Sequence, residues 1–259
     1  MFQVAVLASG SKGNAVLVRT AHATVLVDAG VSRKRILDAI AALYPQPPRI
    51  DAVIISHEHS DHLLSAGAIC RGQNAVLYIT EPTWLVARHK LGRLPRGHVH
   101  FVPGQPFTIG DLVVEPFSGQ HDAVDLSNFV FHVGDQRRLG LATDVGFATR
   151  LLETKLQGCT TLILESNHDM KMLLDGPYPW QVKQRIRSRQ GHLSNEQTVG
   201  VLTKVLHGGL RNLVLAHLSE TNNDPALARA TTEAYLATVR HECNLLVAAQ
   251  HEPTPLLDV

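Results

Sequence analysis

The chain has 259 residues, of which 44% are hydrophobic and 18% are charged, so it can bury a core and is not a disordered tail. Its 24 Lys and Arg residues nearly balance its 23 Asp and Glu residues, and a net charge of +1 excludes whole-molecule attraction to nucleic acid or anionic lipid. No apolar run is as long as a membrane-spanning helix, and three widely spaced cysteines exclude a disulfide framework and favour a cytoplasmic location.

Short strands are predicted in the first third of the chain. They are apolar, β-branched runs at residues 2–8, 15–19 and 24–28, and the first two are separated by the Gly-rich sequence SGSKGN. Within that sequence, Lys12 and Asn14 either face a functional site or belong only to a turn. After Gly30 the periodicity becomes helical, and Ser32 is the expected N-cap.

Strands and helices alternate over the rest of the chain. The predicted strands are 52–55, 75–79, 99–102, 107–109, 112–117, 129–133, 138–143, 162–165, 213–216 and 244–248, and the predicted helices are 81–90, 195–206 and 225–240. The strands 129–133 and 138–143 are expected to form a hairpin across Gly134 and Asp135. This pattern predicts one domain over residues 1–259, with two sheets face to face and helices outside. Its halves, about 1–118 and 119–259, are expected to share one layout.

The segment His57–His62, with the sequence HEHSDH, follows a predicted buried strand and is the strongest chemical signal in the chain. In an extended loop His57 and His59 point to the same side, and the turn that follows directs Asp61 and His62 to a neighbouring point. Imidazole and carboxylate groups bind Zn²⁺ and also accept Mn²⁺. The segment therefore predicts ligands for two metal ions, against the alternative of a polar turn at an exposed strand end.

Three further strand ends each carry a lone His or Asp. His121 follows the strand at 112–117, Asp144 follows 138–143, and His217 follows 213–216. Each alone would more often be structural, but together with the loop they complete a set of ligands. In this set His57, His59 and His121 hold one ion, Asp61, His62 and His217 hold the other, and Asp144 bridges the two.

The HxHxDH loop followed by isolated His, Asp and His residues resembles the metallo-β-lactamase superfamily, and the resemblance runs from Val4 to His217. It implies a four-layer αββα sandwich. Asp28, in the sequence VDAG, matches an early motif that is structural near the site in this superfamily and is not a ligand. Unlike the true β-lactamases, the chain has His62 and no cysteine near a ligand motif. It also has His59 where flavodiiron proteins carry Glu.

More narrowly, four segments resemble the bacterial YycJ/WalJ-type members, which are related to the tRNase Z and RNase J nucleases. They are LASGSKGN, ESNHD, GPYPWQVKQRIRSRQGHLSN and AHLSETNN. This resemblance implies a nuclease that acts on DNA.

The GHLSN sequence resembles a His-containing motif of tRNase Z, which makes His192 the candidate general acid, or the donor to a phosphate oxygen on the leaving side. Glu165, at a strand end, is expected to fix the tautomer of that imidazole. The alternatives are that His192 and Glu165 are surface and strand-end residues. Ser194 and Gln197 also match a helix capping box, and this role is compatible with catalysis by His192.

The expected chemistry follows from the ligand types. Two divalent ions about 3.5–4 Å apart lower the pKa of a shared water, so that a bridging hydroxide is available as nucleophile at neutral pH. Asp61 is expected both to bind a metal ion and to orient the attacking hydroxide. The ligand set suits Zn²⁺ or Mn²⁺, and the sequence does not choose between them.

Residues 171–190 carry five Lys or Arg residues and a single acid, Asp175. Such a local patch suits binding of a phosphate backbone even on a near-neutral protein. Tyr178 and Trp180 are expected to stack on bases. The alternative is a solvated helix face. The residues expected to contact phosphates are Lys183, Arg185, Arg187 and Arg189.

The expected function is therefore a dinuclear metal-dependent phosphodiesterase, an exonuclease acting on DNA, with no membrane partner. The alternative is a small-molecule hydrolase that acts on a thioester, as glyoxalase II does, on a lactone or on a cyclic phosphodiester. A third class is a metal-binding regulatory protein without turnover. The sequence does not decide between DNA and RNA as substrate, and it does not give the polarity of cleavage. The oligomeric state also stays open, and a homodimer is one possibility.

Overall fold

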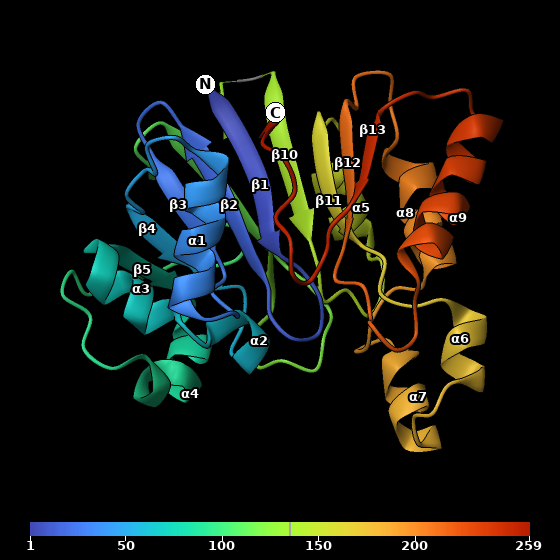
Figure 1. Cartoon of the computed structure of the whole chain (residues 1–259), viewed down its shortest axis with the longest axis horizontal. Helices are drawn as coiled ribbons and strands as arrows, with labels where there is room; N and C mark the ends of the chain where they lie inside the picture. The colour runs from blue at the N-terminus through green and yellow to red at the C-terminus, as the bar shows by residue number, and fades with distance from the viewer. Residues whose placement is uncertain (135) are drawn as a thin grey trace.

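The computed structural model describes residues 1–134 and 136–259 and contains two mixed sheets packed face to face, with helices on their outer faces (Figure 1). This arrangement confirms the predicted αββα sandwich. The first sheet has the order β14 (Leu257–Asp258), β1 (Phe2–Ala8), β2 (Ala15–Thr20), β3 (Thr24–Val27), β4 (Ala52–Ile54), β5 (Val76–Ile79) and β6 (His98–His100). The second has the order β13 (Asn244–Val247), β12 (Asn212–Ala216), β11 (Thr161–Glu165), β10 (Arg137–Ala142), β9 (Ser127–Val133), β8 (Leu112–Ser118) and β7 (Phe107–Ile109).

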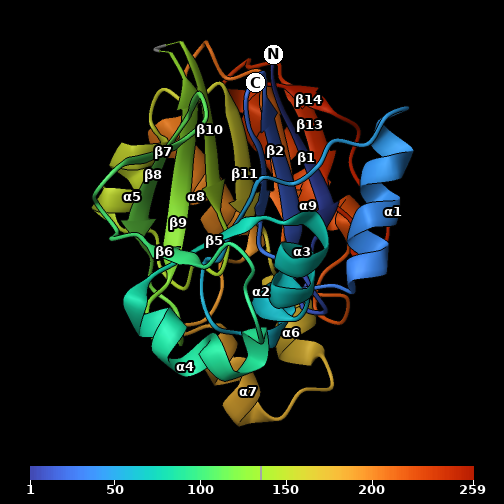
Figure 2. The ribbon, with the colours of Figure 1, turned by 90° about the vertical axis from the view of Figure 1, so that its left-hand side faces the viewer.

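The helices fall into three groups (Figures 1 and 2). The first sheet is covered by α1 (Arg33–Leu43), α3 (Ala66–Gln73) and α4 (Glu81–Leu91). The second is covered by α5 (Arg150–Leu156), α8 (Asn195–Val205) and α9 (Pro225–Thr238). The short helices α2 (Ser60–Leu63), α6 (Met170–Asp175) and α7 (Trp180–Ile186) lie at one end of the sandwich. None of the helices in the described part of the chain is long and apolar enough to cross a membrane.

The strands are apolar on both faces because one face of each sheet packs against the other sheet and the opposite face packs against helices. Along β1, Val4 and Val6 enter the core between the two sheets, whereas Ala5 and Leu7 pack under the helices of the first sheet. Phe129 of β9 belongs to the same central core and is 1% exposed. The continuous apolar runs seen in the sequence are thus a direct result of the layered packing.

The parallel strands fix where the chemistry can lie. β3, β4 and β5 are parallel to one another in the first sheet, and β10, β11 and β12 are parallel in the second. Loops that leave the carboxyl ends of parallel strands meet at one edge of a sheet. The sandwich therefore brings the loops that follow β4, β10, β11 and β12 to one end of the molecule.

Some sequence-based boundaries were wrong. β7 and β8 belong to the second sheet, because β8 pairs with β9 over residues 113–118, so the division of the halves at residue 118 falls too late. The strand expected at 99–102 is β6, one residue earlier at its start and two at its end. The predicted hairpin is confirmed as β9 and β10, although Asp135 in its turn lies outside the described residues. The Ser32 N-cap of α1 is confirmed.

Candidate metal centre

The seven predicted ligand side chains converge at the end of the sandwich where the parallel strands finish. Among the described residues, four groups have potential ligand atoms within 4.8 Å of one another. Two of these groups are the predicted sets for the two ions, a third links them through Asp144, and a fourth joins Asp144 and His217 to His192 and Glu165. The groups are His57, His59 and His121; Asp61, His62 and His217; His57, His62 and Asp144; and Asp144, Glu165, His192 and His217.

The HEHSDH loop has the shape that its alternation predicts. His59 is extended, with φ −61° and ψ 147°, and caps α2, so the chain turns immediately before Asp61 and His62. The rings of His57 and His59 are 4.6 Å apart. Gly30 allows this turn to pack closely, because a Cβ at that position would lie 1.5 Å from the carbonyl oxygen of Asp61.

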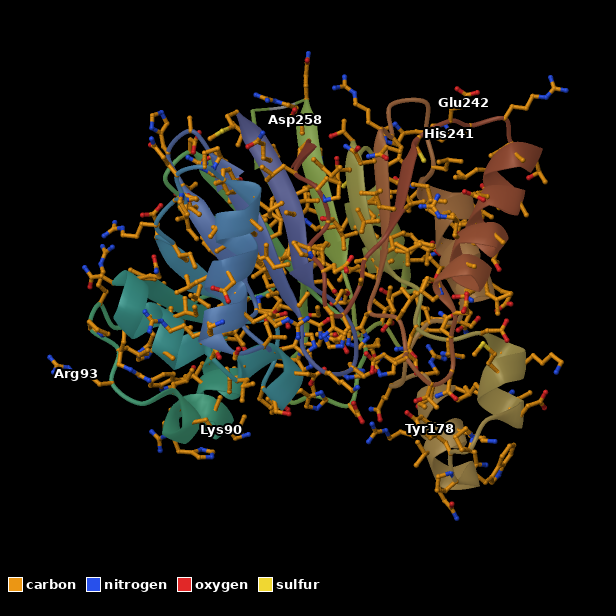
Figure 3. All side chains as sticks on the ribbon, viewed as in Figure 1. Lys90, Arg93, Tyr178, His241, Glu242 and Asp258 are labelled. Atoms are coloured by element: carbon orange, nitrogen blue, oxygen red, sulfur yellow. The ribbon has the colours of Figure 1, made fainter. Side chains whose placement is uncertain are left out.

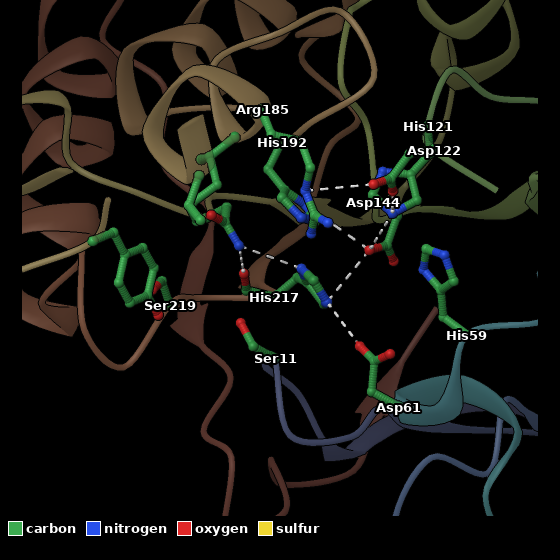
Figure 4. Close-up of a pocket in the computed structure, with 14 residues that line it drawn as sticks. Ser11, His59, Asp61, His121, Asp122, Asp144, Arg185, His192, His217 and Ser219 are labelled. Atoms are coloured by element: carbon green, nitrogen blue, oxygen red, sulfur yellow. Dashed lines mark hydrogen bonds and ion pairs between the residues drawn. The ribbon is translucent and has the colours of Figure 1, made fainter. Parts of the chain in front are cut away.

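Asp144 lies between the two groups of ligands (Figure 4). One carboxylate oxygen, Oδ2, is 3.2 Å from His62 Nε2, and the other, Oδ1, is 3.7 Å from His121 Nε2 and 3.5 Å from His217 Nε2. The backbone reaches this position through a left-handed conformation, with φ of 59° at Asp144 and 57° at His217. Such conformations cost of order 1–3 kcal/mol for non-glycine residues and cluster at functional sites.

Four of the histidines are held through Nδ1 and direct Nε2 toward the cluster. His62 Nδ1 lies 2.8 Å from Asp28, His57 Nδ1 2.9 Å from Ser56 Oγ, His121 Nδ1 3.1 Å from the Gly191 carbonyl, and His217 Nδ1 3.1 Å from Glu165. A partner on one ring nitrogen fixes the tautomer and frees the other nitrogen for a metal ion. Asp28 thus supports the site without belonging to any of the ligand groups.

Several buried atoms in the cluster lack hydrogen-bond partners among the described residues. They include His57 Nε2, His217 Nε2 and Asp144 Oδ2. Burial of an unpaired polar group is costly unless it is compensated, and metal ligation is one form of compensation. A set of imidazole nitrogens and carboxylate oxygens with unused lone pairs fits divalent ions.

The charges of the cluster are strongly coupled. Burial favours the neutral form of His217, but attraction to Asp144 and to Asp61, whose Oδ2 lies 3.8 Å from His217 Nε2, and the hydrogen bond to Glu165 outweigh it and raise the His217 pKa to about 10. Burial likewise opposes ionisation of Asp61, whereas the nearby imidazoles of His217 and His62 hold the pKa of its carboxyl well below the usual range. A metal ion bound at His217 Nε2 would therefore displace a proton from that imidazole.

His192 and Glu165 form a pair beside this cluster. His192 Nδ1 lies 2.7 Å from Glu165 Oε1, so His192 Nε2 is the nitrogen left for the pocket. The other oxygen, Oε2, accepts from the amides of Val145 at 2.8 Å and Leu193 at 3.1 Å. Burial raises the pKa of Glu165, but the charge and hydrogen bond of His192 and the hydrogen bond of His217 lower it to about 2. The Ser194–Gln197 capping box is confirmed next to this pair.

Residues 23–218 match the family model described as the beta-lactamase superfamily domain. The chain belongs to the metallo-β-lactamase superfamily. It is 36% identical over 239 residues to "Exodeoxyribonuclease WalJ" of Streptococcus pneumoniae serotype 2 (strain D39 / NCTC 7466), covering 91% of this chain and 88% of that protein. It is 37% identical over 236 residues to "Exodeoxyribonuclease YycJ" of Bacillus anthracis, covering 89% and 88%.

The fold is also that of solved metallo-β-lactamase structures. The Zn²⁺-bound PqqB from Methylobacterium extorquens superposes with a TM-score of 0.75 at 18% identity, covering 99% of this chain and 100% of PqqB. The predicted resemblance to the superfamily and to its WalJ/YycJ members is thus confirmed.

In this metallo-β-lactamase domain the basic segment 171–190 forms two short helices, α6 and α7, rather than one helix face. Lys183 is 9% exposed, and its ammonium donates to the carbonyls of Leu174 at 2.6 Å and Gly176 at 2.7 Å. The phosphate contact expected of Lys183 stays a prediction, and it would require the ammonium to leave the two carbonyls through which it joins α7 to the end of α6. Arg185 does line the pocket, and its Nε lies 3.5 Å from Asp122.

Of the other predicted contact residues in the segment, Arg187, Arg189 and Trp180 are exposed, whereas Tyr178 is half-buried. Arg187 projects from the end of α7, and the guanidinium of Arg189 lies 4.1 Å from the ring centre of Phe147. Tyr178 lines the pocket, and Trp180 is 55% exposed. Two of the three arginines expected to contact phosphates thus lie outside the pocket lining.

The pocket over the metal centre of this family member has a volume of about 310 Å³ (Figure 4). Sequence reasoning missed four of its polar residues: Ser11 of the SGSKGN sequence, and Asp122, Asn167 and Ser219. Asp122 adjoins His121 and lies 3.0 Å from its Nε2, and Asn167 Nδ2 donates to the His217 carbonyl at 2.9 Å. For Asp122, Asn167 and Ser219, nearness in the chain to His121, Glu165 and His217 was the available signal.

The Gly-rich turn is more than a connection, because Asn14 supports the HEHSDH loop. Its side-chain nitrogen lies 3.1 Å from His62 Nε2, and its backbone amide donates to the Asp61 carbonyl at 2.8 Å. Lys12 instead pairs with Glu220 at 2.5 Å, and both side chains are exposed.

Proposed function

We propose that this chain is a dinuclear metal-dependent phosphodiesterase that degrades DNA from an end. The arrangement that carries the proposal is Asp144 between two groups of ligands, each with an unpartnered imidazole nitrogen (His57 Nε2 in one, His217 Nε2 in the other), with His192 at their side. The substrate class rests on the relatives named as exodeoxyribonucleases. Three unpaired cysteines among the described residues accord with the cytoplasm as the location.

The ions are assigned as the sequence predicted. His57, His59 and His121 would hold one, Asp61, His62 and His217 the other, and Asp144 would bind both. Zn²⁺ and Mn²⁺ both suit these ligands. When bound, such ions supply Lewis-acid stabilisation of a phosphate and lower the pKa of a water molecule.

The chain's own groups orient the reactants and move the proton. Asp61, 23% exposed at its side chain and open to the pocket, accepts a hydrogen bond from the attacking water and aims it at phosphorus. His192, which lines the same pocket, donates a proton from Nε2 to the leaving oxygen. Glu165 holds the Nδ1 proton of His192, so that only Nε2 is available for this transfer. Arg185 is placed to contact a phosphate of the bound strand, with Arg187 and Arg189 further out.

The deciding experiment uses metal-reconstituted protein. End-labelled single- and double-stranded DNA, closed circular DNA, RNA, bis-p-nitrophenyl phosphate and S-lactoylglutathione are tested side by side. We expect linear DNA to be degraded from an end and circular DNA to resist. Equal rates on linear and circular DNA would replace the exonuclease by an endonuclease. Turnover of S-lactoylglutathione alone would replace both by a small-molecule hydrolase. Size-exclusion chromatography of the same preparation decides between a monomer and the homodimer that the sequence leaves open.

A further inference from the structure

The chain carries a second cationic surface, away from the basic segment at α7. Residues 82–110 contain no Asp or Glu, and their four Lys or Arg residues lie on the second half of α4 and the loop to β6. All four are exposed, and none forms an ion pair with any residue that the structure describes. We call this region the α4–β6 surface; its cations are Arg88, Lys90, Arg93 and Arg96.

The backbone that carries these cations is firmly held. Nη1 of the Arg71 guanidinium donates to the carbonyls of Leu91 at 2.8 Å and Arg93 at 3.0 Å. Gly67 of α3 allows α3 and α4 to touch, because a Cβ there would lie 1.8 Å from the Leu91 carbonyl. The cations therefore project from an ordered support rather than from a loose loop.

Ring systems lie beside the cations. The Trp84 ring stacks on His98, with centroids 3.8 Å apart and planes at 19°, and His98 is followed by His100 at 4.8 Å. His98 and His100 are exposed, and neighbouring Leu85 and Val99 are 56% and 44% exposed. Free cations next to exposed rings and apolar side chains are the combination that binds phosphates and bases of a nucleic acid.

The first turn of α4 lies at the same end of the sandwich as the metal centre, and the cations follow along the helix and the loop to β6. β4 leads into the HEHSDH loop, and its parallel neighbour β5 leads directly into α4. Thr83 in the first turn of α4 donates to the Asp125 carbonyl at 3.4 Å, and Glu58 accepts from the Val124 amide at 2.9 Å. These contacts tie α4 to the loop that carries His121. Figure 3 shows Lys90 and Tyr178 on opposite sides of this end of the molecule.

The length of α4 indicates how far the cations of the α4–β6 surface extend from the end of the helix that adjoins the His121 loop. Its 11 residues span about 16 Å at 1.5 Å per residue. At 3.4 Å per nucleotide of a duplex strand, this corresponds to roughly five nucleotides. A DNA strand cleaved at the metal centre can therefore contact these cations only with phosphates several nucleotides from the scissile bond.

We propose that the α4–β6 surface binds the phosphate backbone of the DNA substrate at a distance of several nucleotides from the scissile phosphate. The inference rests on the proposed function and adds a second contact region to it. If all four cations contact phosphates, they contribute roughly 2.8 to 3.6 units to the slope of log K against log salt, at 0.7 to 0.9 per contact.

The test compares the metal-loaded wild type with two variants of equal charge. One is Arg88→Gln/Lys90→Gln/Arg93→Gln/Arg96→Gln. The matched control, Arg137→Gln/Lys204→Gln/Arg211→Gln/Arg240→Gln, also removes three arginines and one lysine, all exposed. Its residues lie in the segments that lead into the amino ends of β10, β12 and β13, opposite the metal centre. Both variants change the formal net charge from +1 to −3.

Affinity is measured by salt titration with a DNA of roughly 20 nucleotides whose end linkages are phosphorothioates, long enough to reach both regions. We expect the α4–β6 variant to weaken binding and flatten the salt slope by about 3 units, and the control to change the slope by less than one. Hydrolysis of bis-p-nitrophenyl phosphate, which is too small to reach α4, should be unchanged in both variants and so verifies their folding.

The other outcomes overturn the inference in distinguishable ways. If all three proteins degrade DNA and show the same slope of log K against log salt, the α4–β6 surface does not contact DNA. An acidic protein would then be the partner to test. Equal losses in both variants would reduce the effect to net charge. Self-association of the α4–β6 variant with unchanged DNA affinity would mean that the cations only protect the edge strand β6. Absence of DNA binding and cleavage in the wild type, with bis-p-nitrophenyl phosphate still hydrolysed, would instead reject the proposed function.

Discussion

Replacement of Glu165 by Gln removes a buried carboxylate that accepts four hydrogen bonds. Oε1 faces the Nδ1 atoms of His192 at 2.7 Å and His217 at 3.1 Å, and Oε2 faces the amides of Val145 and Leu193. The glutamine amide keeps one acceptor and introduces a donor, so two of the four donors lose their partner. Because the backbone amides cannot change, we expect the new NH₂ group to face the two imidazoles.

The size of the expected effects of Glu165→Gln follows from the lowered pKa of Glu165 and from the roles of His192 and His217. A Glu165 pKa of about 2, against 4.5 for an ordinary glutamate, corresponds to roughly 3 kcal/mol in favour of the charged form. His192 loses its tautomer control, which should slow cleavage by about 10²–10⁴. His217 loses the acceptor that leaves Nε2 free for a metal ion, which should weaken metal binding by about 10–100-fold.

The assay measures both effects on one preparation. Metal affinity is obtained by chelator competition, and rates are measured at saturating metal on DNA and on bis-p-nitrophenyl phosphate. Glu242→Gln, an exposed carboxylate at the far end of the molecule, is the control for loss of one charge (Figure 3). Wild-type metal affinity together with a wild-type rate on DNA would refute the idea that Glu165 positions either imidazole.

Three further outcomes are expected. Wild-type protein should bind close to two equivalents of Zn²⁺ or Mn²⁺, and Asp144→Ala should lower both occupancies; elemental analysis that finds at most one ion in reconstituted wild type contradicts this. His192→Ala should keep its metal but lose about 10²–10⁴ in DNA cleavage and less with a p-nitrophenyl leaving group, so equal losses on both substrates would reject the acid role. Burial lowers the pKa of His168 from 6.5 to about 4, so the native state stays neutral where the unfolded chain takes up a proton. Stability should therefore fall as pH drops from 6.5 to 4, by up to about 1.4 kcal/mol per pH unit, and urea unfolding of His168→Gln should lack this component; parallel pH profiles would exclude it.

Much of this fold could be predicted because its strands carry a simple signal. β11 and β12 are short apolar runs that end in Glu165 and just before His217, as buried parallel strands should. The HEHSDH loop was equally readable, since alternation and a following turn are local properties of the chain. The placement of β7 and β8 was not, because apolar alternation does not tell which of two sheets a strand joins.

The basic segment shows a different limit of sequence reasoning. Charge spacing indicated that Lys183 and its arginine neighbours share a role, but the GPYP sequence divides the segment into α6 and α7. The carbonyls of Leu174 and Gly176 then receive the Lys183 ammonium. A pattern of charges shows which side chains are cationic, but it does not show which of them will donate to a backbone carbonyl. The cations of α4 are irregularly spaced, so they form no pattern that predicts a shared surface.

The proposed ligands come from both layers of the sandwich: the HEHSDH loop extends from the first sheet, and His121, Asp144 and His217 extend from the second. Ions held there would cross-link the two sheets, adding to apolar packing and to hydrogen bonds such as that from the His217 amide to Ser9 Oγ at 2.7 Å. An ion present at 1,000 times its Kd would add about 4 kcal/mol to the free energy of unfolding. Each sheet would keep its own helices when the ions are withdrawn, while the junction between the sheets would loosen at the end where substrate enters. A chelator would then act on this protein as a reducing agent acts on one that is stapled by a disulfide.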